Sequence, residues 1–125
     1  MSIIKLSTMN KTWIIDLDGT LFPHNGYLID EKEEPLPGVK DFFGKIPPGD
    51  FTIIVTSRDS TYREATEMNL KRSEIRWNML IMDIPRGERI LINDSKPSGL
   101  VTAHAITLQR DAGLTEIIID YSDSL

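Results

Sequence analysis

The decisive stretch is Trp13-Ile14-Ile15-Asp16-Leu17-Asp18-Gly19-Thr20, in which an apolar run ends in two acids one residue apart and then a glycine. Consecutive large apolar residues indicate a strand, and the glycine ends it. Alternate side chains of an extended chain point to the same side, so we predict that Asp16 and Asp18 share one face. Two like charges placed together cost stability unless a cation or a proton lies between them, which favours a magnesium site.

The chain has 125 residues, of which 40% are hydrophobic, and a net charge of -5. This is the size of one ordinary domain, so we expect a single domain over residues 1–125. No basic run stands out, which argues against a general polyanion-binding surface. The sequence contains no cysteine, and disulfides and thiolate metal sites are therefore excluded. No apolar segment is long enough to span a bilayer, so we expect a cytoplasmic protein with no membrane partner.

Four short apolar runs are continuous instead of alternating, at residues 13–15, 51–55, 79–82 and 90–92. Strands that are buried on both faces have this pattern, and they belong to parallel sheets covered by helices. A fifth candidate, residues 103–108, alternates more and is predicted at the sheet edge. The tail, residues 111–121, is either a last strand or a short helix.

Two helices are predicted between these runs. The first follows Pro37-Gly38, and its apolar residues at helical spacing are Val39, Phe42, Phe43 and Ile46. For the second, Thr61 and Glu64 fit a capping box, and the helix runs to about Lys71. The inward-facing residues expected for it are Tyr62, Ala65 and Met68 or Asn69.

The alternation of strands and helices predicts an α/β fold with a single doubly wound, mainly parallel five-stranded sheet and helices on both faces. Ligands of such sheets bind beyond the carboxyl ends of the strands. Polar residues follow three of the predicted strands, namely Asp16, Thr56-Ser57-Arg58 and Asn93-Asp94, with Lys96 close behind. We therefore expect acids, a hydroxyl and cations at one rim of the sheet.

Three motifs in order, Asp16-Leu17-Asp18-Gly19-Thr20, Thr56-Ser57-Arg58 and Ile92-Asn93-Asp94, resemble motifs one, two and four of the haloacid dehalogenase (HAD) superfamily. The resemblance spans most of the chain, and its first motif is the specific one. Dehalogenases of this superfamily lack an acid at the position of Asp18, and pumping ATPases have a threonine there. The resemblance therefore implies a HAD-like Rossmannoid fold and a phosphatase or mutase.

The resemblance also implies roles for individual residues. Asp16 would be the nucleophile that becomes an aspartyl phosphate, and Asp18 would protonate the leaving oxygen and later activate water. Mg²⁺ would be held by Asp16, the backbone carbonyl of Asp18 and Asp94, with Asn93 as a support or an alternative ligand.

Substrate contacts are expected from residues around these acids. The Thr56 hydroxyl and backbone N–H groups near Leu17 would hold the phosphoryl oxygens. Ser57 and Arg58 leave the second strand, and Arg58 is a candidate for binding a substrate phosphate or another polar group. His24 lies in the segment that follows the first motif, where it either touches substrate or is an exposed loop histidine without a role.

The third motif of the superfamily supplies a lysine, and this sequence has none between Lys71 and Lys96. Arg86 fits the order of the motifs, whereas Lys96 lies nearer the expected rim, so both stay candidates for the catalytic cation. For Arg86 and Arg89, an ordinary turn charge is the competing interpretation.

The segment between Phe22 and Pro37 has room for a flap but not for a cap domain. The chain resembles capless members of the superfamily in this respect. An open site suits a large substrate or one enclosed by a neighbouring subunit, so a homo-oligomer stays an open alternative.

These inferences favour a magnesium-dependent phosphatase that hydrolyses a phosphate monoester of a sugar or a similar small metabolite. A polynucleotide 3′-phosphatase is the alternative, although the acidic balance argues against tight nucleic-acid binding, which usually needs a basic track. From another class, the missing lysine permits a non-catalytic module that binds phosphate or a partner.

Overall fold

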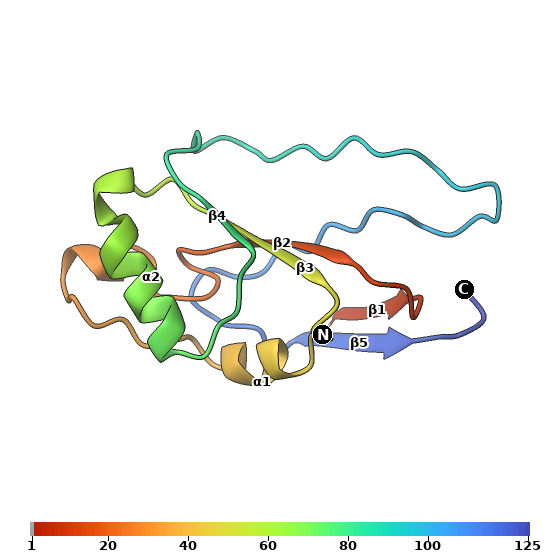
Figure 1. Ribbon diagram of the computed structural model, residues 1–125, viewed down its shortest axis with the longest axis horizontal. Helices are drawn as coiled ribbons and strands as arrows, with labels where there is room; N and C mark the ends of the chain where they lie inside the picture. Colours follow the sequence, from red (N-terminus) through yellow and green to blue (C-terminus); the bar gives the residue numbers. More distant parts are fainter. Residues whose placement is uncertain (1) are drawn as a thin grey trace.

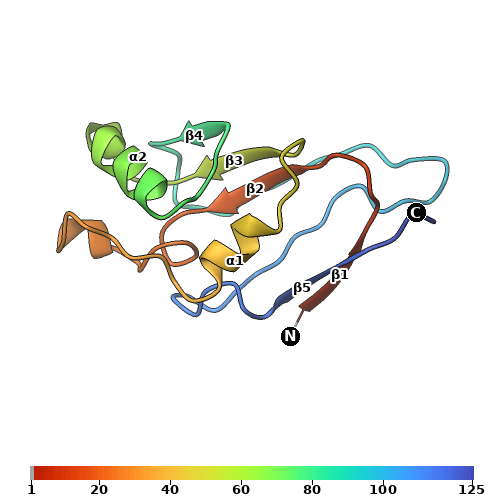
Figure 2. The ribbon, with the colours of Figure 1, turned by 60° about the horizontal axis from the view of Figure 1, so that its bottom comes forward.

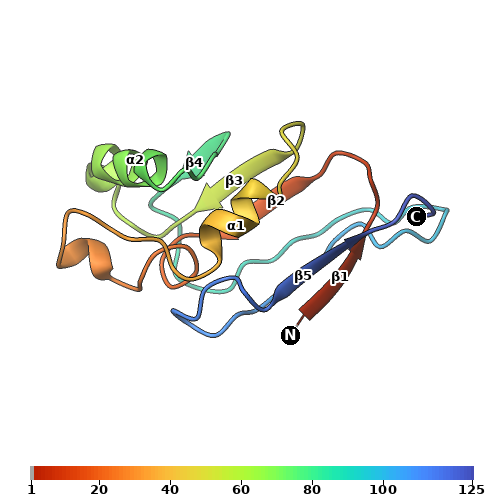
Figure 3. The same ribbon diagram turned by 90° about the horizontal axis from the view of Figure 1, so that it is seen from below.

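The computed structural model describes residues 2–125, which form a mixed α/β structure with two separate parallel sheets (Figure 1). The larger sheet has the order β2 (Thr12–Asp16), β3 (Phe51–Val55) and β4 (Met79–Ile81). In the smaller sheet, β1 (Ser2–Leu6) pairs with β5 (Ile117–Tyr121). Figures 2 and 3 show the smaller sheet standing apart from the larger one. The α/β class and three of the predicted strands are confirmed, but the single five-stranded doubly wound sheet is wrong.

Two predicted strands, residues 90–92 and 103–108, are coil in the structure. Both belong to a long loop, residues 84–109, that runs away from β4 and returns (Figure 1). Ile90 and Ile92 expose 83% and 90% of their surface. An apolar run becomes a buried strand only where it pairs with a sheet edge and is covered by another layer. Residues 90–92 do neither. The tail forms β5, which settles the choice between strand and helix.

The first predicted helix is α1 (Val39–Gly44), and Val39, Phe42 and Phe43 are buried as expected. The second is α2 (Arg63–Arg72), preceded by a 3-10 turn, η2 (Ser60–Tyr62). This turn is capped by Asp59, which accepts the N–H of Thr61 at 2.8 Å, in place of the predicted capping box.

The inward face of α2 differs from the prediction. Asn69 is buried, which confirms one of the two alternatives at that point, and Thr66 and Leu70 are buried beside it. Tyr62, Ala65 and Met68 are exposed. Two of the three buried residues are polar because they bind a buried ion pair beneath the helix. An apolar-periodicity argument cannot find such a face.

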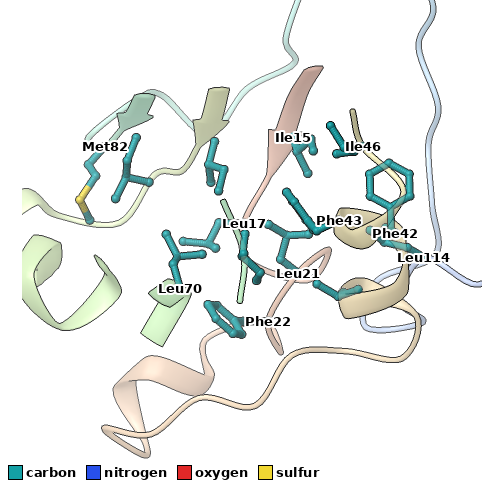
Figure 4. Packing of buried hydrophobic residues seen from close by; sticks show 14 residues of the cluster. Ile15, Leu17, Leu21, Phe22, Phe42, Phe43, Ile46, Leu70, Met82 and Leu114 are labelled. Atoms are coloured by element: carbon teal, nitrogen blue, oxygen red, sulfur yellow. The ribbon is translucent and has the colours of Figure 1, made fainter. Parts of the chain in front are cut away.

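Both helices pack on the same face of the larger sheet, so the predicted cover of helices on both faces is wrong. Register aligns Ile15, Ile54 and Leu80 in one row, and this row is buried in the core with residues of both helices (Figure 4). In the neighbouring row, Ile14 and Met79 expose 55% and 46% of their surface. Successive side chains of a strand point to opposite faces, so the second face of this sheet is open.

The loop after β2 is held by a turn near the C-terminal end. The N–H of Asp111 donates to the Gly19 carbonyl at 2.9 Å, and the N–H of Leu114 donates to the Pro37 carbonyl at the same distance. These contacts join residues 17–24, the start of α1 and the turn into β5. Within residues 2–125, we find no helix with the length and apolarity required to cross a membrane.

Candidate active site

Asp16 is the last residue of β2 and lies at the carboxyl end of the larger sheet. Its Oδ2 accepts the hydroxyl of Thr20 at 3.0 Å, and its Oδ1 forms an ion pair with Nη1 of Arg89 at 2.8 Å. The side chains of Asp16 and Arg89 are 35% and 42% exposed. The Asp16 carboxylate is therefore oriented by its neighbours and still open to a ligand from solvent.

A tight loop follows β2 and carries the chain past Asp18. The Leu17 carbonyl accepts N–H groups from Leu21 and Phe22 at 2.9 and 3.1 Å. Gly19 has a φ of +81°, which glycine adopts without the steric cost of a side chain. Leu17 is fully buried, so its side chain belongs to the core and does not face the site.

Asp18 is held by two residues from the end of β3. Its Oδ2 accepts the Thr56 hydroxyl at 2.8 Å, and its Oδ1 accepts Nη2 and Nε of Arg58 at 2.9 and 3.0 Å. The Asp18 side chain is 18% exposed, whereas that of Arg58 is 1% exposed. The two acids of the first motif thus lie in different settings, because Asp16 has partly exposed partners and Asp18 has buried ones.

Arg58 is the centre of a buried network. Its Nη1 donates to Glu33 Oε2 at 2.9 Å and to the Thr66 hydroxyl at 3.1 Å, and its Nη2 also pairs with Glu33. Burial lowers the pKa of Arg58, but the hydrogen bonds to Glu33 and Asp18 outweigh this and hold the pKa above its ordinary value. The guanidinium therefore carries a fixed positive charge between two carboxylates.

The expected substrate role of Arg58 does not match this placement. A guanidinium has five N–H donors, and all five are engaged by Asp18, Glu33 and Thr66. No donor is left for a phosphate, so Arg58 orients Asp18 instead. Thr56 is equally buried, and its hydroxyl binds Asp18 where we expected it to meet a phosphoryl oxygen.

Ser57 lies in the loop that follows β3, and His24 lies in the segment that follows β2. The Ser57 hydroxyl donates to the Pro85 carbonyl at 3.4 Å, which joins the loops after β3 and β4. His24 is exposed, and a Cβ added to Gly19 would lie 3.8 Å from the His24 Cβ. His24 is thus beside the loop that carries Asp18.

The residues of the long loop, residues 84–109, are placed differently from the expectation. Asn93 donates to the Thr102 carbonyl at 3.4 Å, and the Asp94 carbonyl accepts the Thr102 hydroxyl at 2.6 Å. The Lys96 backbone carbonyl accepts a hydrogen bond from the Gly99 N–H. These contacts stay within the loop, whereas Arg89 is the member that reaches Asp16.

The expected magnesium site consists of the Asp16 and Asp94 carboxylates and the Asp18 backbone carbonyl, with Asn93 as a support or an alternative. Among residues 2–125, no three histidine, cysteine, aspartate or glutamate side chains are grouped closely enough to hold a metal ion. Asp16 has a guanidinium on one oxygen, and the Asp18 carboxylate, which is not the predicted ligand atom, accepts Arg58 and Thr56. Asp94 lies in an exposed part of the long loop, and the Mg²⁺ ligand set stays a prediction.

Sequence reasoning missed two residues of the site. Arg89 fits an ordinary turn charge, and no local pattern marks it for the site, because it precedes an apolar run that forms no strand. Glu33 carries no such signal either, because it stands among other charged residues in a segment read as a flap. Only its burial, at 4% exposed, distinguishes it from Glu31 and Glu34.

An aromatic pair covers the Arg58 network on the flap side. The Tyr27 ring lies 4.1 Å from the Arg58 guanidinium, and it meets Tyr62 edge-on with ring centroids 4.9 Å apart. Burial raises the pKa of Tyr27, and the negative charge of Asp18 adds to the rise. Tyr27 is therefore neutral beside the site at ordinary pH.

Comparison with known proteins gives two structural neighbours. A chain of the solved Pnkp1/Rnl/Hen1 complex matches 66% of this chain and 31% of its own length, with 27% sequence identity and a TM-score of 0.51. A chain of a second structure, of the Pnkp1/Rnl/Hen1 RNA repair complex, matches 66% of this chain and 28% of its own, with 28% identity and a TM-score of 0.51.

The present chain thus spans about a third of the length of the chains that it matches. No protein-family model matches the sequence. No curated protein matches it either. The structural similarity is therefore to components of an RNA repair complex, and it covers 66% of this chain.

Proposed function

We propose that this protein is a phosphoric monoester hydrolase that removes a 3′-phosphate from a polynucleotide end, preferably RNA. The observation that carries the proposal is the unequal setting of two acids at one strand end. Asp16 has half-exposed partners, and Asp18 is held in a fixed direction by Arg58 and Thr56. A nucleophile must reach the substrate, whereas a proton donor must be aimed at one oxygen.

In the proposed reaction, an Asp16 oxygen attacks phosphorus and the ester bond to the leaving oxygen breaks. Asp18 enters this step in its acid form and gives its proton to the leaving oxygen, and Asp16 becomes an aspartyl phosphate. Asp18 then accepts a proton from water as the water cleaves the intermediate. Arg89 supplies positive charge beside Asp16, where an anionic carboxylate must approach an anionic phosphate.

The substrate class is inferred from the structural neighbours and from the open site. Both neighbours belong to a Pnkp1/Rnl/Hen1 assembly, and one of them is described as an RNA repair complex. This favours the polynucleotide reading over the metabolite that the sequence suggested. A chain end needs only a local cationic contact at the reacting phosphate, so the net charge of -5 does not forbid it.

The test is phosphate release from a substrate panel. It contains a 3′-phosphorylated RNA oligonucleotide, the same oligonucleotide phosphorylated at its 5′ end, a sugar phosphate and 4-nitrophenyl phosphate. We expect release from the 3′-phosphorylated RNA, and a loss of at least about a hundredfold in Asp16→Asn, because no nucleophile remains. Asp41→Asn, which changes an exposed aspartate on α1, is the matched control.

Two outcomes contradict the proposal in different ways. Release from the sugar phosphate with none from either oligonucleotide would restore the metabolite reading. No release from any ester, with the protein folded, would leave a module that binds phosphate or a partner.

Dependence on Mg²⁺ remains a prediction from the HAD resemblance, and the reaction above assigns no step to it. Each assay is therefore run with added Mg²⁺ and with a chelator. We expect release to require the ion. Equal release in both would remove the metal from the proposal and leave Arg89 as the cation at Asp16.

A further inference from the structure

We infer that Glu33, which lies in the flap of residues 23–37, is a positioning residue for Asp18 and acts through Arg58. The inference rests on the proposed function, in which Asp18 gives a proton to the leaving oxygen. It goes further in assigning a part of that step to a residue outside the motifs. Glu33 touches neither substrate nor reacting atoms in this scheme.

The geometry makes Arg58 a bridge between two acids. One edge of its guanidinium faces Asp18, with Nη2 to Oδ1 at 2.9 Å, and the other faces Glu33, with Nη1 to Oε2 at 2.9 Å. The side chains of Arg58 and Glu33 are 1% and 2% exposed. Because the guanidinium is planar and rigid, fixing one edge fixes the other.

Glu33 is itself held by α2. The amide of Asn69 donates to Glu33 Oε2 at 3.1 Å and accepts the Glu33 N–H at 3.3 Å. Arg72 donates to the Glu33 carbonyl at 2.7 Å. The helix therefore fixes both the backbone and the carboxylate of Glu33, so the direction of Asp18 depends on how the flap is docked on α2.

Loss of the Glu33 charge would loosen the aim of Asp18. Arg58 would keep one carboxylate partner, and the edge of the guanidinium that faced Glu33 would no longer be held by a charge. A displacement of about 1 Å at a reacting group costs roughly a hundredfold in rate. The loss would fall on proton transfer, because Asp16 has other partners, Thr20 and Arg89.

Leaving-group dependence separates this role from a general loss of structure. A phenolate that is a good leaving group departs without a proton, whereas a poor one needs the acid. A damaged fold would slow both substrates alike. A mis-aimed acid slows the poor leaving group selectively.

The experiment compares 4-nitrophenyl phosphate with phenyl phosphate, which is similar in size but has the poorer leaving group. For Glu33→Gln we expect kcat on phenyl phosphate to fall at least about tenfold more than kcat on 4-nitrophenyl phosphate, with little change in KM. Glu34→Gln is the matched control, because it removes the same charge from the exposed neighbouring residue. Thr66→Val, which removes another partner of Nη1, should give a smaller loss of the same kind and serves if Glu33→Gln does not fold.

Equal losses on both substrates, or no loss, would overturn the inference. A second readout needs no activity: protection of the Arg58 guanidinium protons from solvent exchange, followed by NMR. We expect protection in the parent and in Glu34→Gln, and its loss in Glu33→Gln. Inactivity of the parent on every ester would refute the proposed function, whereas Arg58 protons that stay protected in Glu33→Gln would refute the positioning role.

Discussion

Arg89 takes the place beside Asp16 that the sequence offered to Arg86 or Lys96. Its ion pair with Asp16 spans 2.8 Å, but both side chains are more than a third exposed. Exposed pairs of this kind contribute about 0–1 kcal/mol to folding, because solvent screens them and ordering long side chains costs entropy. The importance of Arg89 is therefore expected in catalysis and not in stability.

Arg89→Ala should lower turnover at least about tenfold, which corresponds to about 1.4 kcal/mol of barrier, because the charge beside the nucleophile is lost. Arg86→Ala and Lys96→Ala are matched removals of one positive charge from the same loop, and smaller losses are expected. Initial rates and melting temperatures of the three variants measure this. A larger loss from Arg86 or Lys96 would return the third-motif role to that residue.

Arg58 gives the opposite expectation for stability. Its removal leaves Glu33 buried without the guanidinium, and breaking a buried pair in this way costs about 3–5 kcal/mol. Arg89→Ala is the control, since Arg89 pairs with Asp16 at 2.8 Å with both side chains more than a third exposed, where the cost should stay near about 0.5 kcal/mol. Urea unfolding measures both changes, and equal costs would contradict the buried network.

At the scale of elements, the site is assembled by the loops that follow the strands. The N–H of Thr56 donates to the Ile81 carbonyl at 2.9 Å, and the N–H of Asp83 donates to the Arg58 carbonyl at 2.9 Å. These bonds tie the loop after β3 to the loop after β4. The turn at Gly113 ties the C-terminal part of the chain to the start of α1, because the Gly113 backbone packs against Pro37.

Gly113→Ala should destabilise the fold more than Gly99→Ala. Both glycines have a positive φ, +86° and +85°, and alanine there costs about 1–2 kcal/mol. A Cβ at Gly113 would also lie 2.1 Å from the Pro37 carbonyl oxygen, whereas at Gly99 it would meet nothing within 4 Å. Overpacking adds about 1–3 kcal/mol, so the difference between the two unfolding free energies measures the close approach. Equal costs would mean that the turn can move away from Pro37.

At the scale of the whole molecule, the larger sheet has one packed face and one open face. The packed face belongs to the core of α1, α2 and the row that contains Ile15 and Ile54. The open face carries Ile14 and Met79, and the long loop leaves Ile90 and Ile92 in solvent.

Ile15→Ala and Ile14→Ala test this asymmetry with the same chemical change at neighbouring residues of β2. We expect a cost of about 2–5 kcal/mol for buried Ile15 and under about 1 kcal/mol for exposed Ile14. Chemical unfolding at several protein concentrations measures both. A large, concentration-dependent cost for Ile14→Ala would instead show that a second copy covers the open face, as the homo-oligomer alternative holds.

The sequence alone was sufficient for the α/β class, for β2, β3, β4 and α1, and for the two acids at the end of β2. These features are local: continuous apolar runs, helical spacing, and a glycine after a pair of aspartates are all written in neighbouring residues. Residues 90–92 carry the same apolar signal and form no strand, because a strand also needs a partner edge that local sequence does not encode. Only the tertiary structure decided which charges meet. Glu33, Arg58 and Asp18 are joined by burial, and Arg89 reaches Asp16 across the length of the chain, since pairings between distant residues depend on how the loops pack.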